Sequence, residues 1–144
     1  MNMGIDFPKK LAAAYNAVCK PLCRELNIPQ TAFDILMFLA NNPENRTAKD
    51  ICTMRRLKPG IVSLHVDTLV TLGFLERKSV PGDRRKLRLE PTEKASSIIA
   101  RGRQMHERFA QTLAQGLSPE ELSCFARCME TISQNLERAA TGME

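Results

Sequence analysis

The stretch from Leu57 to Leu89 constrains the fold more than any other part of the chain. It begins with a polar turn, continues for about fifteen residues with an apolar stripe, and passes through Gly73-Phe74-Leu75-Glu76-Arg77 into two short strand-like runs. Pro81-Gly82-Asp83 provides the turn between these runs, which we place at residues 74–80 and 86–90. Strands this short are not stable alone and must pack on the helices, so the stretch predicts a helix followed by a small hairpin wing.

A second, shorter helix is predicted just before this stretch. Thr47-Ala48-Lys49-Asp50 has the pattern of a capping box, in which the threonine oxygen accepts a backbone N–H and the acid lies near the positive end of the helix. The helix should end near Arg55, and Leu57-Lys58-Pro59-Gly60 forms the turn into the next helix, whose buried stripe consists of Val62, Val66 and Leu69. Two short helices joined by a tight turn predict a helix-turn-helix.

The remaining helices lie toward the two ends of the chain. Apolar residues from Phe7 to Leu26 recur at steps of three and four, with Pro21 expected to kink or break that helix. A helix that is apolar on most sides follows at 32–40 and is expected to be buried centrally. Thr92 is the expected cap of a helix that continues to Gly116, and the last helix begins at Ser118-Pro119-Glu120-Glu121.

These elements predict a mainly α fold with a small β-wing (α+β), in which a winged helix-turn-helix carries further helices at both ends. We divide the chain into an N-terminal dimerisation helix at 1–28, a winged helix-turn-helix DNA-binding domain at 29–91, and C-terminal dimerisation helices at 92–144. A small central domain cannot bury all of these amphipathic helices, so we expect them to form a homodimer with the same helices of a second copy. The alternative is that they fold back as a monomeric bundle.

Positive charge is concentrated in the central part of the chain. The formal charge is +5, yet residues 46–88 alone contain eleven Lys and Arg against four Asp and Glu. Such a surface should attract polyanions, although a solvated basic face is the simpler alternative. The absence of Trp and an aromatic content of 5% argue against stacking on single-stranded nucleic acid. The sequence has no apolar run of about 18 residues and no signal peptide, so we expect a cytoplasmic protein that does not enter a membrane.

The candidate DNA contacts fall into three groups. On the second helix of the helix-turn-helix, base edges can be met by Gly60, Ser63, Leu64 and Thr68, although Leu64 could instead be packing surface. The wing offers cations to phosphates and to a narrow minor groove, namely Arg84, Arg85 and Lys86. The turn offers phosphate contacts, which position a protein without reading sequence, at Arg55, Arg56 and Lys58. Asp83 is expected to orient an arginine, because phosphate repels a bare carboxylate.

Two pairs of cysteines have a spacing of four residues, which places each pair on one face of an expected interface helix: Cys19 with Cys23, and Cys124 with Cys128. A redox switch or a soft-metal site is one interpretation, and the filling of packing gaps is the other. Neither His65, expected in the core, nor His106 has a partner at the spacing of a zinc site, and we expect no metal or cofactor. The sequence contains no phosphate-binding glycine loop and no nucleophile motif, so an enzyme is not expected.

The sequence resembles the MarR family of transcriptional regulators over nearly its whole length. The motifs that carry the resemblance are Thr47-Ala48-Lys49-Asp50-Ile51-Cys52, Val66-Asp67-Thr68-Leu69 through Leu72-Gly73-Phe74-Leu75-Glu76-Arg77, and Pro81-Gly82-Asp83-Arg84-Arg85 followed by Thr92-Glu93-Lys94. The resemblance implies a homodimer, joined through its first and last helices, that binds a pseudo-palindromic operator in duplex DNA. Members of the family usually repress, and many release DNA when a small phenolic or lipophilic compound, an oxidant or a metal acts near the dimerisation layer.

The resemblance also implies that Asp67 and Arg77 belong to a set of salt bridges that positions the wing. The chain departs from the family pattern at several positions. Pro91 stands where Leu is usual and Ala95 where Gly is usual, while basic residues are common at the positions of Leu64 and Thr68. These departures concern the operator sequence rather than the fold.

We therefore predict a homodimeric, sequence-specific regulator that binds duplex DNA, acts as a repressor and is released by a small-molecule effector. One alternative is a winged-helix protein-interaction module, whose basic wing would meet an acidic partner. Another is a thiol- or metal-sensing regulator that uses the interface cysteines.

Overall fold

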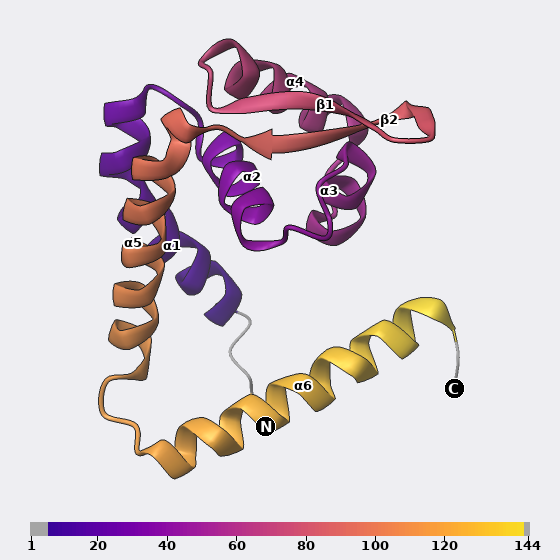
Figure 1. Cartoon of the computed structure of the whole chain (residues 1–144). Helices are drawn as coiled ribbons and strands as arrows, with labels where there is room; N and C mark the ends of the chain where they lie inside the picture. The colour runs from indigo at the N-terminus through magenta and orange to yellow at the C-terminus, as the bar shows by residue number, and fades with distance from the viewer. Residues whose placement is uncertain (1–5, 143–144) are drawn as a thin grey trace. The chain divides into compact units, whose positions relative to one another are not determined.

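The fold is mainly helical with a two-stranded antiparallel wing, as predicted (Figure 1). The computed structural model describes residues 6–142. Within that range the elements are α1 (Phe7–Leu26), α2 (Gln30–Asn41), α3 (Ala48–Arg55), α4 (Pro59–Thr71), β1 (Leu75–Val80), β2 (Asp83–Pro91), a 3-10 helix η1 (Glu93–Ala95), α5 (Ser96–Ala114) and α6 (Pro119–Thr141). The chain forms two compact units, Met1–Phe109 and Ala110–Glu144, which we describe separately.

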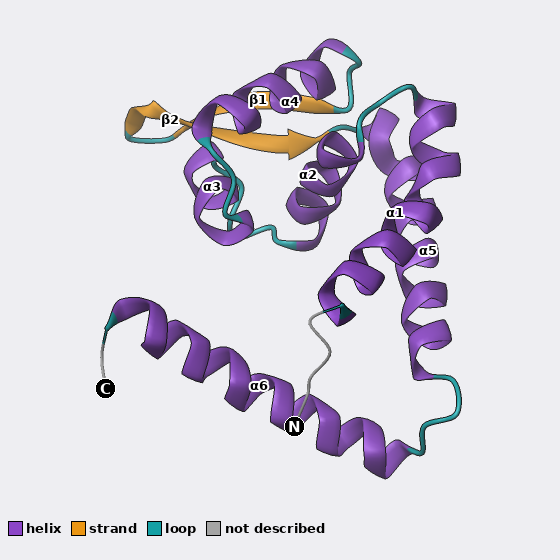
Figure 2. Cartoon of the chain, turned by 180° about the vertical axis from the view of Figure 1, so that it is seen from behind, coloured by secondary structure: helices purple, strands orange, loops and turns teal. Residues whose placement is uncertain are grey.

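Helix α2 occupies the centre of the first unit, as its apolar sequence predicts. Most of its side chains are buried, including Phe33, Ile35, Leu36 and Leu39, which have no exposed surface. It packs against α1, α4 and β2. The helices and the hairpin that surround it can be followed from behind in Figure 2. A helix buried on so many sides explains why the sequence shows almost no polar face here.

Two helix starts follow the capping pattern seen in the sequence. The hydroxyl oxygen of Thr47 accepts the backbone N–H of Asp50 at 3.1 Å, and the Asp50 carboxylate accepts the backbone N–H of Thr47 at 2.9 Å. The Thr47 hydroxyl also donates to the Asp50 carboxylate at 2.7 Å, and this bond, followed by that from the Thr47 backbone N–H, lowers the pKa of Asp50. Ser118 and Glu121 form the same reciprocal pair at the start of α6. The predicted capping box at Thr47 is confirmed, and the predicted helix start at Ser118 proves to be a second capping box.

Helix α1 continues as one helix through Pro21, so of the expected kink or break, the break does not occur. Proline removes one helical hydrogen bond, and packing must compensate for the loss. Cys19, Leu22 and Cys23 are buried on either side of the exposed Pro21. Tertiary packing of the adjacent turns therefore holds the helix together where the local sequence favours an interruption.

The strands of the wing pair with Glu76 opposite Glu90 and Lys78 opposite Arg88, and the register shifts between Ser79 and Val80. The second strand is longer than the predicted 86–90, because its pairing already begins at the turn residue Asp83.

Thr92 occupies the N-cap position of η1, as predicted, but its side chain makes no capping hydrogen bond. Its hydroxyl instead donates to the carbonyl of Gly73 at 2.5 Å, and its N–H donates to the carbonyl of Phe74. Gly73 has φ +78°, a backbone conformation that favours glycine. Thr92 thus ties the end of the wing to the turn that precedes it.

Gly102 marks a close approach of α5 to α2. A Cβ atom added there would lie 2.5 Å from Sδ of Met37 and 3.1 Å from Cζ of Phe33. We expect Gly102→Ala to lower the free energy of unfolding by about 1–2 kcal/mol, because overpacking of the core outweighs the better helix propensity of alanine. Denaturation by urea, followed by circular dichroism, measures the loss.

Gly60 in α4 provides the matched control for this substitution. A Cβ atom added at Gly60 meets no atom within 4 Å. Gly60→Ala should therefore leave the stability unchanged or raise it by up to about 1 kcal/mol. Similar losses in the two variants would show that steric contact with α2 is not the cause.

The second unit consists of the end of α5 and the helix α6. No residue of α6 is buried, and its apolar residues recur at steps of three and four: Leu122, Phe125, Met129, Ile132 and Leu136. We call these five residues the α6 stripe. In the part of the chain that the structure describes, no helix is both long and apolar enough to cross a membrane.

Candidate nucleic-acid interface

Helices α3 and α4 form the predicted helix-turn-helix. Arg56 ends α3 in the left-handed conformation with φ 52°, and its backbone N–H donates to the carbonyl of Cys52. Pro59 then occupies the first turn of α4, where its missing N–H costs no helical hydrogen bond. The local sequence therefore ends one helix and starts the next within three residues, Arg56 to Lys58.

Helix α4 buries one face and exposes the other. Val62, Val66 and Leu69 are buried, as the sequence predicts, while Ser63 and Leu64 lie on the exposed face. Leu64 is 59% exposed, so most of its surface is open to solvent. The hydroxyl of Thr68 donates to the carbonyl of Leu64 at 3.1 Å, which commits its donor to its own helix. Gly60 is also exposed, at the start of this helix.

A groove of about 1030 Å³ lies between α3, α4 and the wing strands. Its lining includes the cationic residues Lys49, Arg77, Arg85 and Lys86, together with apolar side chains such as those of Met54, Val62 and Leu87. The groove thus brings together cations from a helix and from both strands, between the helix-turn-helix and the wing. Cations arranged in this way suit a phosphate backbone that runs past the groove.

The three wing cations lie close to the hairpin turn at the start of β2. Arg84, Arg85 and Lys86 are all exposed, and within residues 6–142 none of them forms an ion pair closer than 4 Å. The Asp83 carboxylate accepts the backbone N–H of Arg85 at 3.0 Å. Asp83 therefore contacts the main chain of Arg85 rather than a guanidinium group. The hairpin turn extends past α3 and α4 in both views (Figures 1 and 2).

Asp67 of α4 and Arg77 of β1 form an ion pair. Their side chains are 61% and 37% exposed, so this is a surface pair rather than a buried one. Pairs of this kind contribute about 0–1 kcal/mol to stability. The contact joins the helix to the base of the wing, and whether it positions the wing on DNA stays a prediction.

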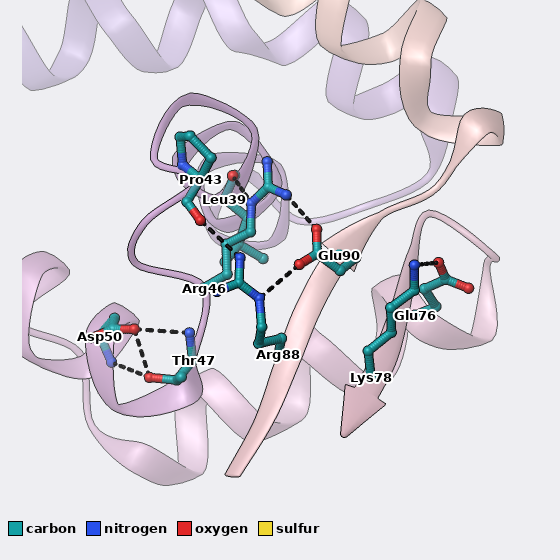
Figure 3. Close-up of polar contacts among 9 residues, drawn as sticks. All are labelled: Leu39, Pro43, Arg46, Thr47, Asp50, Glu76, Lys78, Arg88 and Glu90. Carbon is teal, nitrogen blue, oxygen red and sulfur yellow. Dashed lines mark hydrogen bonds and ion pairs between the residues drawn. The ribbon is translucent and has the colours of Figure 1, made fainter. Parts of the chain in front are cut away.

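A second set of polar contacts fixes the base of the wing, and sequence reasoning missed it. We call Arg46, Arg88 and Glu90 the Glu90 clamp, because both arginines pair with the Glu90 carboxylate (Figure 3). Arg46 also donates to the carbonyl of Leu39, and Arg88 donates to the carbonyl of Pro43, each at 2.9 Å. The clamp therefore joins β2 to the segment between α2 and α3.

The Glu90 clamp reduces the number of basic residues in the segment 46–88 that can contact a ligand. The side chains of Arg46 and Glu90 are only 17% and 18% exposed. Burial acts to raise the pKa of Glu90, but hydrogen bonds from Arg88 and Arg46 outweigh it, and the pKa is lowered. Two of the eleven basic residues are thus committed to internal contacts. The charge available to a ligand comes mainly from the wing tip and the turn.

Arg55 is also connected to the interior of the first unit. Its guanidinium lies 3.9 Å from the carboxylate of Asp34, which accepts a hydrogen bond from the hydroxyl of Tyr15 at 2.7 Å. The same hydroxyl lies 3.0 Å from Nε2 of His106 on α5. Arg56 and Lys58, by contrast, are exposed on the turn itself. The three predicted turn cations therefore lie close in sequence but in different surroundings.

The candidate cysteines differ in their surroundings. Cys19 and Cys23 are 0% and 8% exposed, and burial raises the pKa of both thiols, that of Cys23 to about 11. A protonated, buried thiol reacts slowly, so their position favours a packing role. Cys124 and Cys128 on α6 are exposed. Among the described residues, no three His, Cys, Asp or Glu side chains form a group that could hold a metal ion.

The two histidines lie on different helices, His65 on α4 and His106 on α5. His65 is half-buried rather than fully in the core, and its Nδ1 atom is buried without a hydrogen-bond partner. His106 instead contacts the rings of Tyr15 and Phe33.

Comparison with known proteins also points to the part of the chain that contains the helix-turn-helix and the wing. A sequence model described as the MarR family matches residues 26–86, from the end of α1 to the wing. Among solved structures, a MarR protein from Peptoclostridium difficile has a TM-score of 0.83 and 19% identity, and the match covers 100% of this chain and 93% of that one. A putative MarR family transcriptional regulator from Listeria monocytogenes, complexed with a 26mer DNA, has a TM-score of 0.77 and 15% identity over 98% of both chains.

A MarR transcriptional regulator from Methanosarcina mazei has a TM-score of 0.77 and 16% identity, and the match covers 91% of this chain and 94% of that one. No curated protein matches the chain significantly. At these levels of identity, the structural likenesses establish the fold.

Proposed function

Because this chain belongs to the MarR family of winged-helix transcriptional regulators, we propose that it binds duplex DNA as a homodimer and represses transcription until an effector releases it. The observation that carries the proposal is the exposed face of α4, which lies beside a groove rimmed by Lys49, Arg85 and Lys86. The Listeria monocytogenes structure with a 26mer DNA supports a duplex as the partner.

We propose that the wing and the turn supply more of the affinity than base reading does. The exposed face of α4 offers a hydroxyl at Ser63 and an apolar contact at Leu64, while the Thr68 hydroxyl donates to its own helix. Each good base contact is worth about 1–3 kcal/mol of discrimination, and this face offers few. Contacts with phosphates and with a narrow minor groove depend on cations, which the wing and the turn supply.

Selection of bound duplexes from a random pool tests the proposal. The purified full chain should enrich an inverted repeat whose half-sites lie about one helical turn of DNA apart, because two copies related by twofold symmetry read both halves. The affinity of the enriched duplex should fall as salt rises. Enrichment of a single half-site would contradict the homodimer, and a pool without any enriched sequence would contradict sequence-specific binding.

The exposed apolar residues of the terminal helices support the homodimer. Phe7 in α1 is 60% exposed, and in the α6 stripe Phe125 is 54% and Leu136 is 65% exposed. Burial of apolar surface contributes roughly 25 cal/mol per Å², so a second copy that covers these faces would gain stability. The same helices would set the spacing between the two copies of α4.

Charges placed in the α6 stripe are expected to dissociate the homodimer. In Phe125→Glu/Met129→Glu, two carboxylates would have to be buried without partners, so the dimer dissociation constant should rise at least about 100-fold. Sedimentation velocity over a range of concentrations measures the change. Gln134→Glu adds a charge on the side of α6 away from the stripe and should sediment like the wild type. A charged stripe variant that remains dimeric would exclude α6 from the interface.

A hollow along the second half of α1 and the turn into α2 supports release by an effector. Its volume is about 660 Å³, and its lining combines Lys20 and Arg24 with Asn16, Asn27, Gln30 and the apolar Ile28. Such a lining suits a small anionic or amphipathic molecule. An effector releases DNA only if it binds better to the state in which the two copies of α4 are mis-spaced.

A further inference from the structure

The chain contains a second pair of cysteines with the same spacing as the exposed pair on α6. Cys124 and Cys128 are four residues apart and exposed, whereas Cys19 and Cys23 are four residues apart and buried. Both exposed thiols lie well inside α6, which runs from Pro119 to Thr141 behind a capping box. The helix therefore holds them on one side at a defined separation, and the chain contains an internal control for the effect of burial.

The helical spacing excludes a disulfide and permits a bridge through one atom. Residues four apart in a helix have Cβ atoms about 5–6 Å apart, whereas a disulfide needs about 3.5–4.5 Å. A soft atom that forms bonds of about 2.3 Å to each sulfur, as zinc does, spans the longer separation without unwinding the helix. Cys124 and Cys128 thus suit chelation better than oxidation to a disulfide.

The ligand class follows from the number of donors. No group of three or more His, Cys, Asp or Glu side chains in residues 6–142 could hold a metal ion, so the pair offers two thiolates and no third ligand. A tetrahedral zinc site needs four ligands. A trivalent arsenic atom that carries one organic substituent needs two more bonds, and soft thiolates suit a soft centre of this kind.

We propose that Cys124 and Cys128 form a chelating dithiol site for a monosubstituted trivalent arsenical. With the dihydroxy form of such a compound, two S–H bonds and two As–O bonds break, two As–S bonds form, and two molecules of water leave. The oxidation states of arsenic and sulfur do not change. The site is independent of the proposed DNA binding.

The site lies beside the α6 stripe rather than within it. Cys124 and Cys128 directly precede the stripe residues Phe125 and Met129, and adjacent residues in a helix point about 100° apart. The bound arsenical would therefore occupy the flank of the stripe. It remains compatible with an α6 that pairs through its apolar face.

The probe is phenylarsine oxide. Digestion with trypsin can show whether one phenylarsenic group bridges Cys124 and Cys128, because a cleavage site lies between them. Trypsin cleaves after Arg127, which lies between the two cysteines and separates Cys124 in residues 109–127 from Cys128 in residues 128–138. After one equivalent reacts with the reduced full chain, denaturation and digestion should yield these two peptides joined through one phenylarsenic group. Mass spectrometry identifies the product.

The buried pair gives a different product. Trypsin does not cleave between Lys20 and Pro21, so Cys19 and Cys23 remain together in residues 11–24. An adduct found only in that peptide would overturn the proposal. Cys19→Ser/Cys23→Ser should retain the joined peptides, and Cys124→Ser/Cys128→Ser should lose them while its circular dichroism spectrum remains that of the wild type.

Chelation is distinguished from attachment through one thiol by competition. In Cys124→Ser, Cys128 is the only thiol of α6 left to hold the arsenical, and glutathione should remove it from residues 128–138. Wild type should need about 100-fold more glutathione for the same loss, because the second thiol of a chelate acts at high effective concentration. Equal release from the two proteins, or retention of the adduct in the double α6 variant, would overturn the proposal.

Discussion

Replacing Arg84 and Arg85 with alanine is expected to weaken binding to the operator by roughly 30- to 700-fold, which corresponds to about 2–4 kcal/mol. Both side chains are exposed at the start of β2 and, in the range 6–142, neither is held by an ion pair. Each lost phosphate contact also removes the release of a counterion. The slope of log affinity against log salt should therefore decrease by about two, which fluorescence anisotropy titrations at several salt concentrations measure.

A variant with the same loss of charge distinguishes contact from net charge. Lys9 and Lys10 are exposed on α1, in a helix with no proposed role in DNA contact. Lys9→Ala/Lys10→Ala should therefore bind the operator within about twofold of the wild type at physiological salt, where exposed charges beyond about 8 Å are largely screened. If both double variants lose affinity equally, the wing makes no specific contribution.

Glu90→Ala is expected to lower the free energy of unfolding by about 2–3 kcal/mol. The substitution leaves the Arg46 guanidinium, whose side chain is 17% exposed, without its carboxylate. Removal of one partner of a fully buried pair costs about 3–5 kcal/mol, and partial access to water reduces that cost. For a chain of this size the melting temperature should fall by roughly 5–10 °C, as measured by differential scanning calorimetry.

The stabilising effect of Glu90 should depend on pH. Its pKa is lowered in the folded chain, so the stabilisation is complete above the unfolded value and is lost as pH falls through the lower folded value. The difference between wild type and Glu90→Ala should therefore shrink below about pH 4.3, the ordinary value for glutamate. A difference that stays constant to pH 2 would mean that packing, and not charge, is responsible.

Glu76 offers the matched control on the neighbouring strand. It pairs with Lys78 at 3.1 Å, but the two side chains are 52% and 59% exposed (Figure 3). An exposed pair of this kind contributes about 0–1 kcal/mol, so Glu76→Ala should leave the melting temperature almost unchanged. Equal destabilisation by the two substitutions would contradict the role assigned to the Glu90 clamp.

The sequence predicts those features that depend on neighbouring residues. Thr47 with Asp50 and Ser118 with Glu121 form the expected capping boxes, because both partners lie within one helical turn. The buried stripe of α4 and the hairpin turn at Gly82 follow local periodicity and turn chemistry in the same way. The fold could therefore be predicted from short-range patterns.

Errors arise where distant parts of the chain decide the outcome. Pro21 predicts a kink or a break, and the break does not occur because buried neighbours on the same helix hold α1 together. Thr92 has the chemistry of a cap, yet its hydroxyl contacts Gly73, nineteen residues earlier in the chain. Neither competing contact can be recognised from the residues next to it.

In the candidate site too, some features follow from the local sequence and others depend on contacts between distant residues. Exposure of the wing cations agrees with their place beside a turn, whereas the pairing of Arg46 with Glu90 joins residues 44 positions apart. Arg46 and Arg84 contribute equally to the formal charge of residues 46–88. Of these two, only Arg84 is available at the surface. The one local hint of the clamp is the alternation of Arg88 and Glu90, which places both side chains on one side of a strand.

The burial of α2 limits how the first unit can move. A helix with packed neighbours on nearly every side cannot slide by a turn or rotate about its axis without opening close-packed contacts along its length. Rearrangement is easier at its ends, where Asn27 adopts a left-handed conformation before Pro29, and where Asn42 and Pro43 precede α3. Motion that starts at α1 or α5 should therefore reach α3 and α4 as rigid-body rotation about these two hinges.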